Sequence, residues 1–166
     1  MVQRWQTQVP PGPMLDAACG LGRGIASAPG SVSRIVAVDL SLTGIRQARR
    51  LWAERGGIGW IVADVATLPL PAGYFAMICA FGFTDWRFLR RAETLLMPGG
   101  VLFYEGFSPR QRAVRPTLDL NWTATPAQLD QLFGRWRQLA CAESTEPPYR
   151  TRLAAVHPTE PEESHP

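Results

Sequence analysis

The stretch MLDAACGLGRG, which begins at Met14, places Asp16 just before the alternating glycines Gly20 and Gly22. Glycines in such a pattern let a ligand approach the main chain closely. The dinucleotide fingerprint G-x-G-x-x-G is not met, because Ile25 or Ser27 stands at the third glycine position. The chain has no lysine, which excludes a P-loop. A carboxylate repels a pyrophosphate, so the stretch predicts a nucleoside-like ligand with a cationic amino group.

Two further acids follow at the ends of expected strands. Asp39 closes an apolar strand predicted over 34–40, and Asp64 closes a strand predicted over 60–65. The carboxyl ends of parallel strands form the ligand crevice of an open α/β sheet. Asp39 is therefore placed to accept hydrogen bonds from the hydroxyls of a ribose.

The elements that must position these residues alternate between strand and helix. Strands are expected at 14–18, 34–40, 60–65, 75–83 and 101–107, helices at 22–28, 41–57, 85–97 and 125–136, and two final strands at 137–145 and 149–158. The pattern predicts an α/β, Rossmann-like doubly wound, mainly parallel seven-stranded sheet with a C-terminal antiparallel hairpin. Residues 1–13, which end in PPGP, are expected to lack regular structure.

The length of 166 residues and the 46% apolar content indicate one globular domain over 1–157. The acidic tail 158–166 is expected to be disordered. No apolar run is long enough for a membrane span, and no signal peptide is evident. An odd number of cysteines in apolar settings favours reduced thiols and a cytoplasmic location. His157 and His165 form no metal site with these cysteines.

All 17 basic residues are arginines, and ten of them fall into three groups. Solvated helix faces are the favoured explanation for the groups at 46–55 and 87–91. The third group, Arg110, Arg112 and Arg115, lies in a loop and leaves an anionic partner open. A nucleic acid is not expected.

Four segments together resemble the class I S-adenosylmethionine-dependent methyltransferases. LDAACGLGR (15–23) resembles their first motif, VDLS (38–41) the second, ADVATLPLPAGYFAMI (63–78) the third, and LLMPGGVLFYEGF (95–107) the segment entering the fifth strand. Within the family, the chain is most similar to small-molecule enzymes of the tellurite-resistance or type 11 kind.

The resemblance implies that S-adenosylmethionine is the cofactor and that a dozen residues line its site. These residues are Asp16, Ala18, Cys19, Gly20, Gly22, Asp39, Leu40, Ser41, Asp64, Val65, Phe81 and Gly82. Asp16 is expected near the amino group of the cofactor, Asp39 at the ribose hydroxyls, and Asp64 at the adenine amino group. Phe81 and Gly82 are expected on the sulfonium side.

The chain departs from the family pattern in two ways. Ala18 stands where glycine is usual. Only 13 residues precede Met14, so the N-terminal lid helices of the family are expected to be missing. Three explanations stay open: a naturally lidless protein, a homodimer or partner that completes the site, or a recorded start that is late.

We expect methyl transfer to a small-molecule acceptor. A methyltransferase-fold binding module that acts through a protein partner is the alternative, and a nicotinamide-dependent oxidoreductase is a remote one. No catalytic base is assigned, because methyl transfer from a sulfonium relies mainly on orientation. Tyr104, Glu105, Asp85 and Trp86 are in a position to reach the acceptor, but core or loop-anchoring roles suit Tyr104 and Glu105 equally well. Cys19 is expected to be a small buried residue rather than a nucleophile.

Overall fold

The computed structural model describes residues 1–159. A single seven-stranded sheet runs through it in the order β3-β2-β1-β4-β5-β7-β6. Its strands are β1 Gly12–Ala17, β2 Val32–Asp39, β3 Ile58–Val62, β4 Phe75–Phe81, β5 Leu96–Phe107, β6 Arg137–Glu143 and β7 Arg150–Val156. Strands β1 to β5 are mutually parallel, while β7 is antiparallel to both β5 and β6. The predicted fold class is confirmed.

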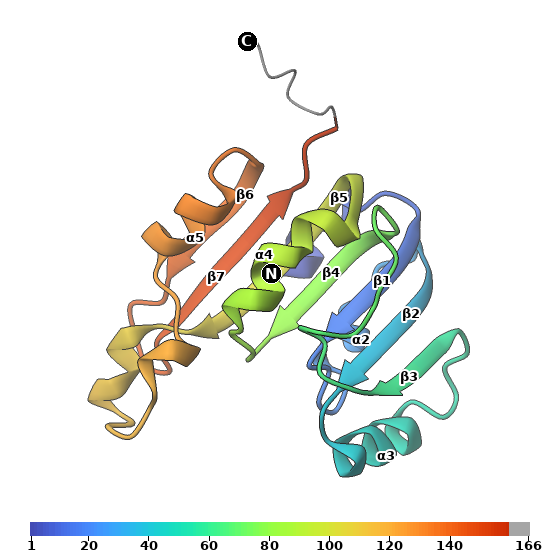
Figure 1. Cartoon of the computed structure of the whole chain (residues 1–166), viewed down its shortest axis with the longest axis horizontal. Helices are drawn as coiled ribbons and strands as arrows, with labels where there is room; N and C mark the ends of the chain where they lie inside the picture. Colours follow the sequence, from blue (N-terminus) through green and yellow to red (C-terminus); the bar gives the residue numbers. More distant parts are fainter. Residues whose placement is uncertain (160–166) are drawn as a thin grey trace.

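Helices cover both faces of the sheet, with α4 and α5 together on one face (Figure 1). They are α1 Val2–Trp5, α2 Arg23–Ala26, α3 Leu42–Leu51, α4 Trp86–Leu95 and α5 Pro126–Phe133, with short 3-10 turns at Gln6–Gln8, Pro109–Ala113 and Leu120–Trp122. Strand β1 supplies side chains to both cores, because neighbouring strand residues point to opposite faces. Leu15 packs in the core that contains Phe88 of α4, and Met14 packs in the core that contains Ile25 of α2.

Successive strands move outward from β1 on one side to β3 and from β4 on the other side to β5. The order therefore reverses between β1 and β4, and the crevice of such a sheet opens at this point. The loops after β1, β2, β3 and β4 all leave the sheet at the same end, the carboxyl end of the parallel strands (Figure 1).

Several predicted boundaries were wrong for identifiable reasons. Asp64 does not close a strand: β3 ends at Val62, and Asp64 lies in the following loop. The Pro98–Gly100 segment does not separate helix from strand, because β5 already begins at Leu96, which pairs with Phe75. Residues 1–13 are not irregular, since α1 and a 3-10 turn form there and Val2 is buried. The tail predicted to be disordered falls almost wholly outside the described residues.

Within residues 1–159, none of the helices combines the length and the apolar character that crossing a membrane requires.

Candidate functional site

The loop after β1 uses left-handed backbone at every second residue. The φ angles are +52° at Ala18, +52° at Gly20 and +87° at Gly22. Ala18 is the only residue other than glycine with a positive φ in the described chain, at the position where the resemblance described above predicts glycine. Side chains with a Cβ adopt this conformation at a cost of about 1–2 kcal/mol.

The glycines of this loop serve different purposes. A Cβ added to Gly20 would meet no atom within 4 Å, so the backbone there faces open space. A Cβ on Gly22 would collide with the indole of Trp52, and one on Gly24 with the carboxylate of Asp16. Gly20 therefore leaves room for a ligand, whereas Gly22 and Gly24 leave room for packing within the protein.

Asp16 lies beneath the glycine loop, with 1% of its surface exposed. Its Oδ2 accepts a hydrogen bond from the Ile25 amide at 3.2 Å, which ties β1 to α2. Burial raises the pKa of Asp16 to about 7, although the Ile25 hydrogen bond and the Arg23 charge lower it in part. The carboxyl is thus held close to its titration point at neutral pH. Its expected place near a cofactor amino group stays a prediction.

Asp39 joins the two loops that form the crevice. Its Oδ2 accepts from the Gly20 amide and its Oδ1 from the Ser41 amide, both at 2.8 Å. Ser41 in turn caps α3, since its Oγ accepts from the Gly44 amide at 3.0 Å. Each carboxylate oxygen has two lone pairs, so Asp39 can still accept one hydrogen bond on each oxygen.

A hollow of about 110 Å³ lies between these loops. It is lined by Ala18, Val38, Asp39, Leu40, Ala63, Asp64, Val65 and Phe83. Asp64 uses Oδ1 to accept from the Ala66 amide at 2.9 Å, and its Oδ2 lies 3.4 Å from Arg87. Five of the predicted cofactor residues therefore meet in one hollow with apolar walls and two acids at its edge.

The other predicted residues lie around this hollow rather than in it. Cys19 is buried, and burial raises the pKa of its thiol to about 12, with Asp16 and Asp39 adding to the effect. Such a thiol is not a nucleophile near neutral pH. Phe81 and Gly82 lie at the end of β4, where the guanidinium of Arg23 lies 5.8 Å from the Phe81 ring centre.

A second hollow, of about 170 Å³, begins at Phe81. It is lined by Met1, Val2, Arg23, Ser27, Phe81 and Glu105. Glu105 is thereby placed at the crevice, at the end of β5. The two hollows share the loop after β1, which contributes Ala18 to one and leads into Arg23 of the other.

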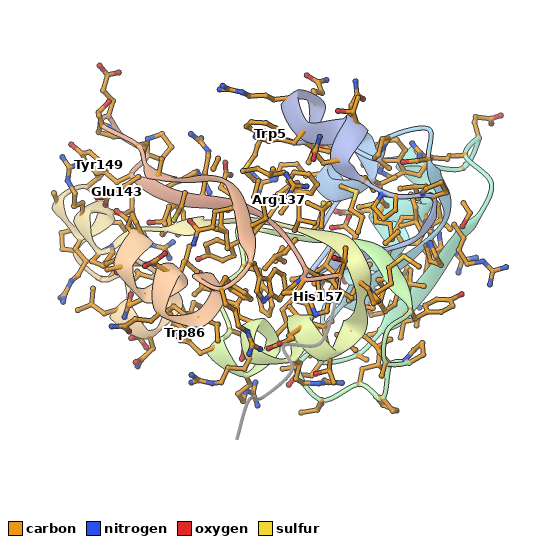
Figure 2. The ribbon with its side chains drawn as sticks, turned by 90° about the horizontal axis from the view of Figure 1, so that it is seen from above. Trp5, Trp86, Arg137, Glu143, Tyr149 and His157 are labelled. Atoms are coloured by element: carbon orange, nitrogen blue, oxygen red, sulfur yellow. The ribbon has the colours of Figure 1, made fainter. Side chains whose placement is uncertain are left out.

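The remaining candidates for contact with an acceptor have structural roles. Tyr104 is fully buried, its hydroxyl lies 2.8 Å from the Thr84 hydroxyl, and burial raises its pKa to about 12. Asp85 caps α4, and its hydrogen bond with Arg87 lowers its pKa. Trp86 lies on the opposite side of the sheet from Trp5 (Figure 2), in a groove between α4 and α5.

Sequence reasoning missed several residues of the site. Val38, Ala63 and Phe83 line the first hollow. Phe83 could have been found as an aromatic residue directly after Gly82, the first residue beyond β4. Trp52 was assigned to a helix face, yet its Nε1 donates to the Leu21 carbonyl at 2.9 Å and holds the glycine loop. The side chain of Arg91, explained as solvated, donates to the carbonyl of Ala66.

Among the described residues, no group of three or more His, Cys, Asp or Glu side chains could hold a metal ion. The side chains that line the first hollow instead suit a flat heterocycle with attached hydroxyls. Leu40, Val65 and Phe83 offer apolar contact to a ring, while Asp39 and Asp64 offer acceptors.

Comparison with known proteins gives a consistent result. Residues 14–100, more than half of the chain, match the family described as methyltransferase domain. The malonyl-[acyl-carrier protein] O-methyltransferase of Pseudescherichia vulneris is 27% identical over 132 residues, which cover 72% of this chain and 47% of that protein. The chain thus spans about half the length of this curated relative.

Solved structures of low sequence identity share the fold. The N-methyltransferase NodS from Bradyrhizobium japonicum superposes with a TM-score of 0.70 at 15% identity, covering 95% of this chain and 94% of NodS. A SAM-dependent methyltransferase from Leishmania major gives a TM-score of 0.67 at 18% identity, covering 90% of this chain and 65% of that one.

Proposed function

Because the chain belongs to the methyltransferase domain family, we propose that it transfers a methyl group from S-adenosylmethionine to a small-molecule acceptor in the crevice between β1 and β4. The observation that carries the proposal is the double role of Asp39. Its carboxylate fixes the glycine loop through Gly20 and also lines the hollow, so one residue connects the loop to the ligand site.

The two hollows would bind different parts of the cofactor. Asp39 would accept from the ribose hydroxyls, Leu40 and Phe83 would contact the adenine ring, and Asp64 would accept from its amino group. The open space above Gly20 would take the part of the cofactor that joins ribose to methionine. The reactive end would then face Phe81 and Glu105, where the second hollow begins.

When bound, S-adenosylmethionine supplies a methyl group already activated on a positively charged sulfur. The protein then has to orient the acceptor and exclude water, effects worth up to about 7–11 kcal/mol in well-aligned cases. Such a mechanism suits a site in which the buried Tyr104 and Cys19 both have pKa values raised to about 12. The relative from Pseudescherichia vulneris is named as an O-methyltransferase, and we extend oxygen as the favoured acceptor atom to this chain.

A calorimetric titration with S-adenosylhomocysteine and, separately, with NAD tests the proposal. We expect a dissociation constant in the micromolar range for S-adenosylhomocysteine and no measurable binding of NAD. Asp39→Ala should weaken binding by at least about tenfold, or about 1.4 kcal/mol. The control Glu54→Gln removes an exposed carboxylate just beyond α3 and should bind as the wild type does.

Binding of NAD alone would refute the proposal in favour of the oxidoreductase alternative. Turnover of labelled S-adenosylmethionine with oxygen, nitrogen and sulfur acceptors then separates an enzyme from a binding module. The homodimer or covering partner and the cytoplasmic location stay predictions.

A further inference from the structure

Glu105 is surrounded by three arginines at the end of β5. Its Oε1 lies 3.3 Å from Arg23 and 3.4 Å from Arg150, and its Oε2 accepts from Arg152 Nε at 2.8 Å. The arrangement follows from strand register, since Glu105 lies between Phe81 of β4 and Arg152 of β7 on neighbouring strands. We call Arg23, Glu105, Arg150 and Arg152 the arginine cluster.

The arginine cluster has more positive than negative charge. One carboxylate faces three guanidinium groups, and none of the three forms a salt bridge with another acid among residues 1–159. Arg150 is largely enclosed and lies over the Phe107 ring. Its buried Nη1 lies 3.4 Å from Oε1 of Glu105 but makes no hydrogen bond within residues 1–159. Arg23 and Arg152 have 54% and 46% of their side chains exposed, so both can reach a ligand.

The surplus charge lies on the acceptor side of the crevice. Arg23 and Glu105 both line the second hollow, together with Phe81, at the edge where the reactive end of the cofactor is proposed to lie. A cationic sulfur entering this region would be repelled by the two uncompensated guanidinium charges. An anionic acceptor would reduce this repulsion, because its negative charge would lie between the sulfonium and the guanidinium groups.

We propose that the methyl acceptor of this protein is a small carboxylic acid whose carboxylate is bound by Arg152 and Arg23 of the arginine cluster. Guanidinium groups hold carboxylates through paired N–H donors. Among residues 1–159, Arg152 donates only its Nε–H, to Oε2 of Glu105. A hollow of about 170 Å³ suits a short acid better than an extended chain. This inference rests on the function proposed above and specifies its substrate.

The corresponding reaction needs no base. A carboxylate oxygen forms the new O–CH₃ bond while the S–CH₃ bond breaks and its electron pair stays on sulfur. The carboxylate and the sulfonium thereby become a neutral methyl ester and a neutral thioether, with no proton to remove. Because the ester is neutral, the guanidinium groups of the arginine cluster no longer attract it, and this favours release of the ester.

The test compares two probes that differ by one charge. They are the malonyl thioester of N-acetylcysteamine and its methyl ester, each titrated into protein saturated with S-adenosylhomocysteine. We expect the acid to bind at least about tenfold more tightly than the ester. Arg152→Gln should abolish this difference and leave S-adenosylhomocysteine affinity unchanged. Arg115→Gln, which removes an exposed arginine from the loop after β5, should preserve the difference.

A second measurement tests the charge argument. Sinefungin carries an amine in place of the sulfonium methyl group, so the acid should bind more tightly to the sinefungin complex than to the S-adenosylhomocysteine complex. Equal binding of acid and ester, no binding of either, or an unchanged difference in Arg152→Gln would overturn the inference. If S-adenosylhomocysteine itself does not bind, the proposed function fails. Titration of the free protein with both probes then still tests whether the arginine cluster binds the acid more tightly than the ester.

Discussion

Replacing Asp16 by asparagine should change how the stability of the protein depends on pH. In the folded protein the Asp16 carboxyl has a pKa of about 7, against an ordinary value of 3.8. The cause is burial, with 1% of the residue exposed and one amide, that of Ile25, donating to it. Between these two pKa values the folded state binds a proton that the unfolded state has released.

The sign of the effect follows from this difference. Because the folded state holds the extra proton, the free energy of unfolding falls as the pH rises from 3.8 toward 7, and the loss is complete above the folded pKa. One pKa unit corresponds to about 1.4 kcal/mol, so the whole difference amounts to about 4 kcal/mol. About 2 kcal/mol of this should be lost between about pH 5 and pH 7.

Asparagine has no proton to lose and keeps an oxygen that can accept from the Ile25 amide. The Asp16→Asn variant should therefore lack this slope. Near pH 8 it should be more stable than the wild type by about 1–3 kcal/mol, after the cost of burying its NH₂ group. Urea denaturation of both proteins at a series of pH values measures the effect. Identical slopes for wild type and Asp16→Asn would refute the argument, and Glu54→Gln should retain the wild-type slope.

Three further predictions concern the glycine loop and its buried acid. Gly20→Ala should lower the free energy of unfolding by only about 1–2 kcal/mol, because its Cβ meets no atom within 4 Å, yet it should weaken S-adenosylhomocysteine binding at least about tenfold. Wild-type affinity in Gly20→Ala would contradict the assignment of the space above Gly20 to the ligand. Gly22→Ala should cost about 3 kcal/mol or more, because its Cβ collides with Trp52 at a φ of +87°; a thermal shift as small as that of Gly20→Ala would show that Trp52 moves freely. Binding of S-adenosylhomocysteine near pH 7 should release roughly half a proton, since its cationic amino group near Asp16 would lower a pKa of about 7; calorimetry in buffers of different ionisation enthalpy measures this, and a zero release would place the amino group away from Asp16.

Local patterns in the sequence were sufficient for the parallel half of the sheet and for the first hollow. Apolar strands with Asp16 and Asp39 near their carboxyl ends predicted both the strand positions and the end of the sheet where the ligand site lies. The carboxylate of Asp39 does meet the glycine loop, through Gly20. Leu40, Asp64 and Val65 also line the hollow, although Asp64 does so from a loop rather than from a strand end.

Contacts between residues far apart in the chain could not be predicted in this way. The position of β7 between β5 and β6 depends on which strand of the hairpin pairs with β5. A hairpin pattern in the sequence predicts that β6 pairs with β7, but not which of them pairs with β5. It is this register that brings Arg152 to Glu105, 47 residues earlier in the chain. The same limitation hid the bond from Trp52 to Leu21. Helix α3 ends at Leu51, earlier than the glycines Gly56 and Gly57 suggested.

Hydrogen exchange with and without S-adenosylhomocysteine tests most directly whether the cofactor occupies the crevice between β1 and β4. We predict slower exchange in peptides that cover 17–24, 38–45 and 63–67, the three loops around the first hollow. Peptides that cover α5 and β6 should exchange as before, because they lie on the far side of β5. Binding without protection in these loops, or with protection confined to the groove between α4 and α5, would contradict the account.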